Sequence, residues 1–259
     1  MALWRYTRDF FPVSLHKTAE LDPSRNYLFG YHPHGIMSIG AFVTFGTEAN
    51  NVSQLYPGLK IRICALVGQF WFPFRREYIM STGCIDCSKD SISYCLSRRE
   101  KGEAVVLIVG GAVEALDAHP GTYAVTLKKR TGFVKLALQN GADLVPVFSF
   151  GENDVYGQMS NPQGSTVRGM QTWLKNHLGF SPPIFHGRGI FNYSMGILPF
   201  RRPIDVVVGK PIRVEAAVSN PSDEQVASLH GKYMEELRQL FEKNKARFDI
   251  PSDTHLHIL

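Results

Sequence analysis

The chain has 259 residues, a formal net charge of +5 and 44% hydrophobic residues. This length suffices for one large domain, and since neither a linker nor an internal repeat divides the sequence, we expect a single domain over residues 1–259. The modest positive charge favours anionic partners such as phosphorylated cofactors or lipid headgroups. It is too small to indicate nucleic-acid binding, and no nucleic-acid-binding motif accompanies it.

The first predicted strand, residues 26–31, runs directly into His32-Pro33-His34-Gly35. Proline fixes its own φ angle and favours an extended residue before it, so the two imidazoles leave the backbone in a defined geometry. Gly35 permits a sharp turn or a close approach to the backbone. Histidine is the usual proton carrier near neutral pH, and chemistry in α/β sheets gathers beyond the carboxyl ends of strands. We therefore predict His34 as a general base and His32 as the second candidate.

The next notable segment is residues 63–74, which is apolar and aromatic and is followed by Arg75 and Arg76. It is too short to span a bilayer, and no run of eighteen apolar residues indicates an ordinary transmembrane helix. The pattern suits a segment at a membrane interface, with the arginines among the headgroups. A buried core helix fits the same pattern, so both interpretations stay open.

Four cysteines, Cys64, Cys84, Cys87 and Cys95, fall in one third of the chain. Cys84 and Cys87 form a CxxC pair, but a structural zinc site needs four ligands, and no second pair follows at a suitable spacing. We expect reduced cysteines and no bound metal.

A helix that begins after Ser88 is followed by a strand over residues 104–109, which ends in Gly110-Gly111 and then Glu114. Glycines at such a bend expose backbone N–H groups that can stabilise an oxyanion. Glu114 would lie at the same sheet edge as His34, where a carboxylate can orient an imidazole. The alternative is a first-turn glutamate that only complements a helix dipole.

Two basic clusters follow. Lys128, Lys129 and Arg130 precede a predicted helix over residues 133–140, which Gly141 terminates, and Arg201 and Arg202 precede a strand over residues 204–208. Such cations before a helix or strand suit the phosphates of a ligand. The alternative for each cluster is a solvated run of charge.

The remaining elements complete the fold class. A strand over residues 144–150 leads into Gly151-Glu152-Asn153, and a capping box from Ser222 to Gln225 opens the last long helix. We expect the tail after Pro251 to be frayed. Buried strands that alternate with helices predict an α/β fold with a mostly parallel central sheet flanked by helices.

Taken together, the motifs resemble the diacylglycerol acyltransferase type 2 family over nearly the whole chain. The segments that carry the resemblance are residues 31–35, 110–116, 130–137, 145–153 and 185–189. The resemblance implies a single glycerolipid-acyltransferase-like domain. It also implies transfer of a fatty acyl group from acyl-CoA to a mono- or diacylglycerol, at the endoplasmic reticulum membrane with the catalytic face in the cytosol, or at a lipid droplet. The N-terminal hydrophobic hairpin usual in the family is not present in this sequence.

The family resemblance also bears on the site. Distantly similar glycerolipid acyltransferases use an HxxxxD motif, but the positions five residues beyond the two histidines are Met37 and Ile39. The partner carboxylate is therefore expected elsewhere, which favours Glu114. In this interpretation His34 is the base, Glu114 orients it, and backbone groups around Gly35, Gly110 and Gly111 steady the oxyanion. No cofactor is expected beyond acyl-CoA as co-substrate, whose phosphates would contact Lys128, Lys129, Arg130, Arg201 and Arg202.

Three alternatives remain open from the sequence. A wax-alcohol acyltransferase would use the same chemistry on a different acceptor. A metal-dependent hydrolase could use the His-x-His pair as ligands, and this requires further ligands at other strand ends. A lipid-binding protein without catalysis would use the basic and aromatic surfaces for membranes only. The sequence indicates neither the acceptor nor the oligomeric state.

Overall fold

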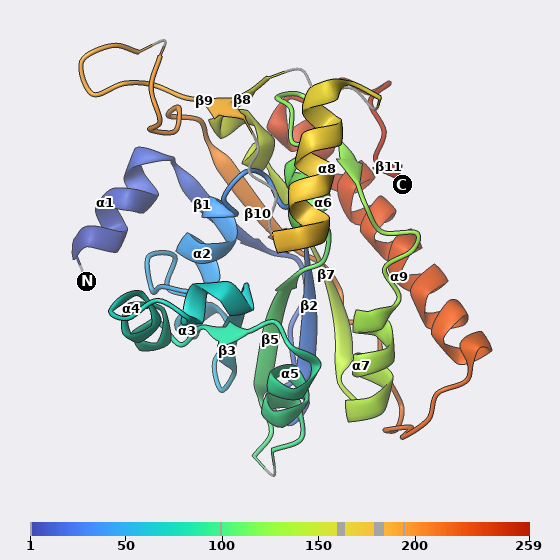
Figure 1. Cartoon of the computed structure of the whole chain (residues 1–259). Coiled ribbons are helices and arrows are strands. Elements are labelled where there is room, and N and C mark those ends of the chain that lie inside the picture. The colour runs from blue at the N-terminus through green and yellow to red at the C-terminus, as the bar shows by residue number, and fades with distance from the viewer. Residues whose placement is uncertain (1, 99, 160–163, 179–183, 194) are drawn as a thin grey trace.

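The computed structural model describes residues 2–98, 100–159, 164–178, 184–193 and 195–259. Its centre is a seven-stranded sheet with the strand order β1-β10-β7-β2-β5-β3-β4 (Figure 1). The strands are β1 (Val13–Lys17), β2 (Tyr27–His32), β3 (Lys60–Ala65), β4 (Ile85–Asp86), β5 (Glu103–Ile108), β7 (Asp143–Phe150) and β10 (Ile204–Val208). All neighbouring pairs are parallel except β10 with β7. The predicted mostly parallel α/β sheet is confirmed.

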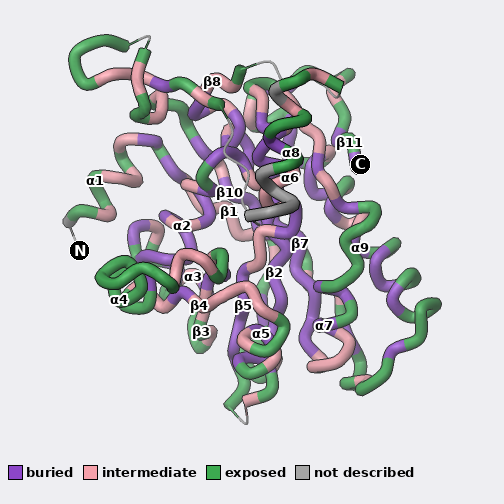
Figure 2. The backbone as a smooth tube through the Cα atoms, viewed as in Figure 1, coloured by how far each residue is buried: buried purple, intermediate pink, exposed green. Residues whose placement is uncertain are grey.

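Helices cover both faces of this sheet. One face packs against α5 (Lys89–Leu96), α7 (Gly132–Asn140) and α9 (Asp223–Asn244). The other packs against α1 (Ala2–Phe10), α2 (Ile39–Phe45), α3 (Val52–Leu55) and α4 (Arg75–Ser81). Two hydrophobic cores therefore lie on opposite sides of the sheet, and Figure 2 shows the central strands as the most continuously buried part of the chain.

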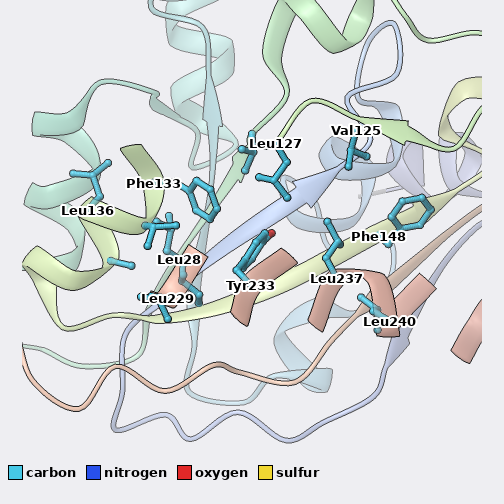
Figure 3. Close-up of a cluster of buried hydrophobic side chains, with 14 of the residues drawn as sticks. Leu28, Val125, Leu127, Phe133, Leu136, Phe148, Leu229, Tyr233, Leu237 and Leu240 are labelled. Carbon is cyan, nitrogen blue, oxygen red and sulfur yellow. The ribbon is translucent and has the colours of Figure 1, made fainter. Parts of the chain in front are cut away.

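Local sequence explains the central elements. Every residue of β2 and of β7 is buried, as expected for strands covered on both faces. Helix α7 ends at Gly141, which adopts the left-handed conformation that glycine accepts without strain. Ser222 and Gln225 form the predicted capping box at the start of α9. Tyr233 of α9 packs with Phe133 and Leu237 against the sheet (Figure 3).

The apolar segment over residues 63–74 is not a core helix. Its first residues complete β3, because Ile63 and Cys64 are buried between β5 and β4, and its remainder forms η1 (Val67–Phe70) and an exposed turn. Trp71 is 76% exposed and Phe74 is 89% exposed, whereas Phe70 is only partly exposed and packs against the core. The structure therefore separates a buried strand from a short exposed aromatic stretch.

The tail after Pro251 is ordered, contrary to the expectation of fraying. Strand β11 (His257–Ile258) pairs with β6 (Ala124–Val125), and Leu256 and Ile258 are buried. These two apolar side chains alternate with His255 and His257, a pattern too short to predict a strand, and they pack the tail beside the segment that precedes α7. A second small sheet joins β8 (Gly157–Gln158) to β9 (Phe185–His186).

Candidate active site

The residues of the candidate site follow the carboxyl ends of three neighbouring parallel strands. His34 follows β2, Glu114 lies in α6 (Gly111–Ala115) after β5, and Glu152 lies in η2 (Glu152–Val155) after β7. Because β2 lies between β5 and β7, the carboxyl ends of these strands meet. The sheet thus places a half-buried imidazole between two buried carboxyl groups.

The His34 imidazole is held in one orientation. Its Nδ1 lies 2.9 Å from the carbonyl oxygen of Gly35, and only a protonated Nδ1 can donate to a carbonyl. In the neutral ring, Nε2 is therefore the nitrogen with a free lone pair. Burial lowers the pKa of His34 below its usual value, although the Gly35 carbonyl opposes this effect. A neutral ring whose second nitrogen has a free lone pair is the state that a general base requires.

The His32 imidazole lies in the core under α9. His32 is completely buried, and its Nε2 lies 3.1 Å from the hydroxyl oxygen of Tyr233. That hydroxyl donates to the Gly30 carbonyl, so Nε2 of His32 must be the donor in the contact with Tyr233. Nδ1 is left without a hydrogen-bond partner among the described residues. Burial lowers the pKa of His32 to about 3, which keeps the ring neutral.

Glu114 contacts the backbone of His34 rather than its ring. The carboxylate accepts the N–H of His34 at 2.6 Å and the N–H of Thr126 at 2.7 Å. The predicted hydrogen bond from an imidazole to the Glu114 carboxylate is therefore wrong, because the two backbone N–H groups donate to the carboxylate and Nδ1 of His34 donates to the Gly35 carbonyl. Burial raises the pKa of Glu114 to about 7, although the two amides and the charge of Arg130 lower it. Glu114 ties α6 and residue 126 to the loop that carries His34.

The three glycines singled out from the sequence serve different needs. Gly110 leaves room for the Glu114 carboxyl group, which a Cβ would overlap. Gly111 has φ +60° and open space around it, and Gly35 has φ +60° and packs against Glu152. These positions require glycine for backbone conformation and close packing. Their part in stabilising an oxyanion stays a prediction.

The structure divides the five basic candidates. Arg130 is exposed and reaches the Gly110 carbonyl at 3.4 Å, and Lys128 and Lys129 are exposed on the same loop before α7. Arg201 instead donates to the carbonyls of Phe10 and Asp9 at the end of α1. Arg202 is exposed and lines a separate cavity of about 590 Å³ together with Arg247 and Phe248. Only the cluster of Lys128, Lys129 and Arg130 lies beside the residues around His34.

Two groups that matter here were not selected from the sequence. Tyr233 belongs to the apolar residues at helical spacing in α9, a pattern that predicted only packing against the domain. Its contact with His32 joins residues that are 201 positions apart in the sequence. Glu152 follows the end of the apolar strand β7. A single carboxylate directly after a buried strand was the sequence signal that could have identified it as a site residue. Within the described ranges, no group of three or more His, Cys, Asp or Glu side chains is arranged to hold a metal ion.

The sequence and the fold match a known family of enzymes. The chain belongs to the diacylglycerol acyltransferase family, whose model matches residues 1–259. The solved structure of the 1-acyl-sn-glycerophosphate acyltransferase PlsC from Thermotoga maritima has the same fold, with a TM-score of 0.50 at 10% identity. That similarity covers 93% of this chain and 80% of the other chain.

The chain is also similar in sequence to acyltransferases that act on mono- and diacylglycerols. The chain is 49% identical to 2-acylglycerol O-acyltransferase 1 of Bos taurus, over 98% of this chain and 76% of that protein. It is 52% identical to diacylglycerol O-acyltransferase 2 of Dictyostelium discoideum, over 94% of this chain and 73% of that protein. It is 48% identical to diacylglycerol O-acyltransferase 2 of Homo sapiens, over 99% of this chain and 66% of that protein. The family resemblance found in the sequence is confirmed.

Proposed function

We propose that this protein transfers a fatty acyl group from acyl-CoA to the hydroxyl of a mono- or diacylglycerol, in triacylglycerol synthesis. The names of its relatives support acyl transfer to such acceptors. The structural observation that carries the proposal is the orientation of His34, whose Nδ1 is held by Gly35 so that Nε2 is free to accept a proton.

In this mechanism His34 acts as the general base. Nε2 takes the proton of the acceptor hydroxyl while that oxygen attacks the thioester carbonyl. The tetrahedral intermediate then collapses, the carbon–sulfur bond breaks, and the imidazolium returns its proton to the leaving thiolate. The imidazolium exists only between these two steps, and an ionised Glu114 carboxylate beside the His34 backbone favours it electrostatically.

The positive charges around the site support acyl-CoA as the acyl donor. Lys128, Lys129 and Arg130 form an exposed cationic loop at the N-terminal end of α7, and Arg130 reaches Gly110 next to Glu114. Cations at a helix N-terminus suit phosphate groups. Arg201 is excluded from this role in our proposal, since its guanidinium already serves the carbonyls of α1.

The acceptor lipids are insoluble, so we place the active face of the protein against a membrane, at the endoplasmic reticulum or on a lipid droplet. No described helix is long and apolar enough to cross a bilayer. Two exposed apolar surfaces support contact with the membrane surface. Trp71, Phe72 and Phe74 lie around η1 and α4, next to the exposed Arg75 and Arg76. The second surface is the segment after β9, whose exposed apolar residues are Ile190, Phe191, Tyr193, Met195 and Ile197.

One assay tests this proposal and its rivals. Purified protein is supplied with labelled oleoyl-CoA and, in separate reactions, a diacylglycerol, a monoacylglycerol or a fatty alcohol. Labelled tri- or diacylglycerol supports the proposal, whereas labelled wax ester alone identifies a wax-alcohol acyltransferase. Lipid binding without any product identifies a lipid-binding protein. Activity that follows the metal content of the preparation would favour the His-x-His hydrolase.

A further inference from the structure

A second buried carboxylate, Glu152, lies beneath the loop that carries His34. Its Oε2 accepts the hydroxyl of Tyr31 at 2.7 Å, the hydroxyl of Ser149 at 3.2 Å and the backbone N–H of Gly40 at 3.1 Å. These donors belong to β2, β7 and the first turn of α2. Hydrogen bonds to a charged acceptor are about twice as strong as those between neutral groups. One carboxylate therefore joins the two central strands to the helix that follows the His34 loop.

The Glu152 side chain also fills the space under this loop. A Cβ at Gly35 would lie 2.7 Å from Cγ of Glu152, and a Cβ at Gly40 would lie 2.5 Å from Oε2. Both positions must therefore be glycine while Glu152 occupies its place. The Gly35 residue that rests on Glu152 is the one whose carbonyl holds Nδ1 of His34.

The loop is thus held from two directions. Glu114 binds the His34 amide, and Glu152 supports Gly35 and binds the Gly40 amide. Within the loop, the Ser38 hydroxyl donates to the His34 carbonyl at 2.8 Å. These anchors fix backbone groups on both sides of His34, and they thereby hold in place the Gly35 carbonyl that accepts from Nδ1 of the ring.

We propose that Glu152 is a positioning residue for acyl transfer. By fixing the Gly35 carbonyl, it aims Nε2 of His34 at the acceptor hydroxyl without touching substrate itself. This inference rests on the proposed function of His34 as the base. Misplacing a catalytic group by about 1 Å can lower a rate about 100-fold, so a positioning role is measurable.

Glu152→Gln is the main test. A glutamine oxygen in the place of Oε2 carries less charge for the three donors, and the NH2 group in the place of Oε1 then faces the Gly40 N–H, which lies 3.3 Å from Oε1 in the parent, so the loop shifts. We expect kcat to fall about 10- to 100-fold, while KM for acyl-CoA and for the acceptor stays within about two-fold. Glu103→Gln is the matched control. Glu103 is also completely buried, but it pairs with Arg62 and Arg98. It lies at the first residue of β5, whereas the candidate site lies beyond the carboxyl ends of the strands. That variant should lose stability and keep its kcat.

If the Glu152→Gln variant does not fold, the Tyr31→Phe variant tests the same positioning role. It removes one donor and keeps the carboxylate, so we expect a smaller fall in kcat, about 3- to 10-fold, with KM unchanged. In the double variant the two effects should not multiply, because both act through the same contact. The Tyr31→Phe variant should stay folded and unfold a few degrees below the parent, because the buried carboxylate loses one hydrogen bond.

The outcomes separate this inference from the proposed function. Parent-like kcat in folded Glu152→Gln, with His34→Ala inactive, overturns the positioning role and leaves the acyltransferase mechanism intact. An equal loss of kcat in Glu103→Gln also overturns it, because general loosening would then explain both variants. Full activity in His34→Ala would instead reject the proposed base.

Discussion

At the scale of single residues, His34 should carry the chemistry. We expect His34→Ala to lose at least about 100-fold in kcat, the lower range for loss of a general base, while the protein stays folded. The ring is only half buried, so its removal leaves no large cavity. The measurement is the turnover of labelled oleoyl-CoA, with circular dichroism to confirm folding.

His255→Ala is the control for that experiment, because His255 is an exposed imidazole of the tail that contacts Glu242. It should keep full activity. Near-parental turnover in folded His34→Ala would show that His34 is not the general base. His32 does not replace it in that role, since the His32 ring has no contact with solvent.

Glu114→Gln should act on kcat. The carboxylate accepts two backbone N–H groups at 2.6 and 2.7 Å, and a glutamine must turn its NH2 group toward one of them. We expect a clear fall in kcat with little change in KM for acyl-CoA, measured in the same assay. A variant that raised KM for acyl-CoA and left kcat unchanged would show that Glu114 serves substrate binding instead.

The sequence could predict where His34 and Glu114 lie, because both follow buried strands at motifs rich in glycine. It could not predict the contacts that they make. The direction of the His32 ring depends on Tyr233 of α9, and the partner of Glu114 depends on how α6 and residue 126 meet the loop. Such contacts follow from packing between distant segments rather than from local pattern.

At the scale of elements, the exposed aromatic turn around η1 and α4 should bind membranes. Replacing Trp71, Phe72 and Phe74 with serine should weaken binding to anionic vesicles, because these side chains are exposed and suit the interface. Higher salt should weaken parental binding too, since it screens the neighbouring Arg75 and Arg76. Vesicle sedimentation measures both effects.

Tyr94→Ser is the control, since Tyr94 is an exposed aromatic residue on α5. It should bind vesicles like the parent. If the triple serine variant also binds like the parent, the turn is not the contact. The segment after β9 should then be tested by replacing Ile190, Phe191 and Ile197, which are all exposed.

The elements that the sequence predicted well share strong local signals. Strands β2, β5, β7 and β10 are continuous apolar runs, and α7 and α9 have clear end signals. Strands β3 and β4 were missed because β3 mixes charged and apolar residues and β4 has only two residues. For such strands, pairing with a neighbour decides the structure more than the local sequence does.

At the scale of the whole molecule, alternation of strands and helices predicted a mostly parallel sheet, but not the strand order. Strand β10 runs antiparallel to β7 and pairs with β1, which places residues 13–17 beside residues 204–208 at one side of the sheet. The tail likewise pairs with β6 far from it in sequence. These pairings join segments that lie far apart in the sequence, and no local pattern encodes them.

The two buried carboxyl groups should also shape the stability of the whole molecule against pH. Burial raises the pKa of Glu114 and of Glu152 from 4.5 to about 7. Between these values the folded chain binds protons that the unfolded chain has released, so these groups make the protein less stable as pH rises from about 5 to 8. Buried His32, with its pKa lowered to about 3, works in the opposite direction, since it makes the protein less stable as pH falls below 6.5.

Comparing variants isolates the carboxylate effect, because His32 is present in each. Glutamine does not ionise, so Glu152→Gln lacks the penalty for a buried charge at every pH. It should therefore destabilise the protein less at pH 8 than at pH 5, and a shift from 4.5 to about 7 makes the difference roughly 2 to 3 kcal/mol. Urea unfolding at the two pH values measures it, and Glu114→Gln should behave alike. An equal loss of stability at both values would mean that Glu152 ionises in the fold as easily as in water.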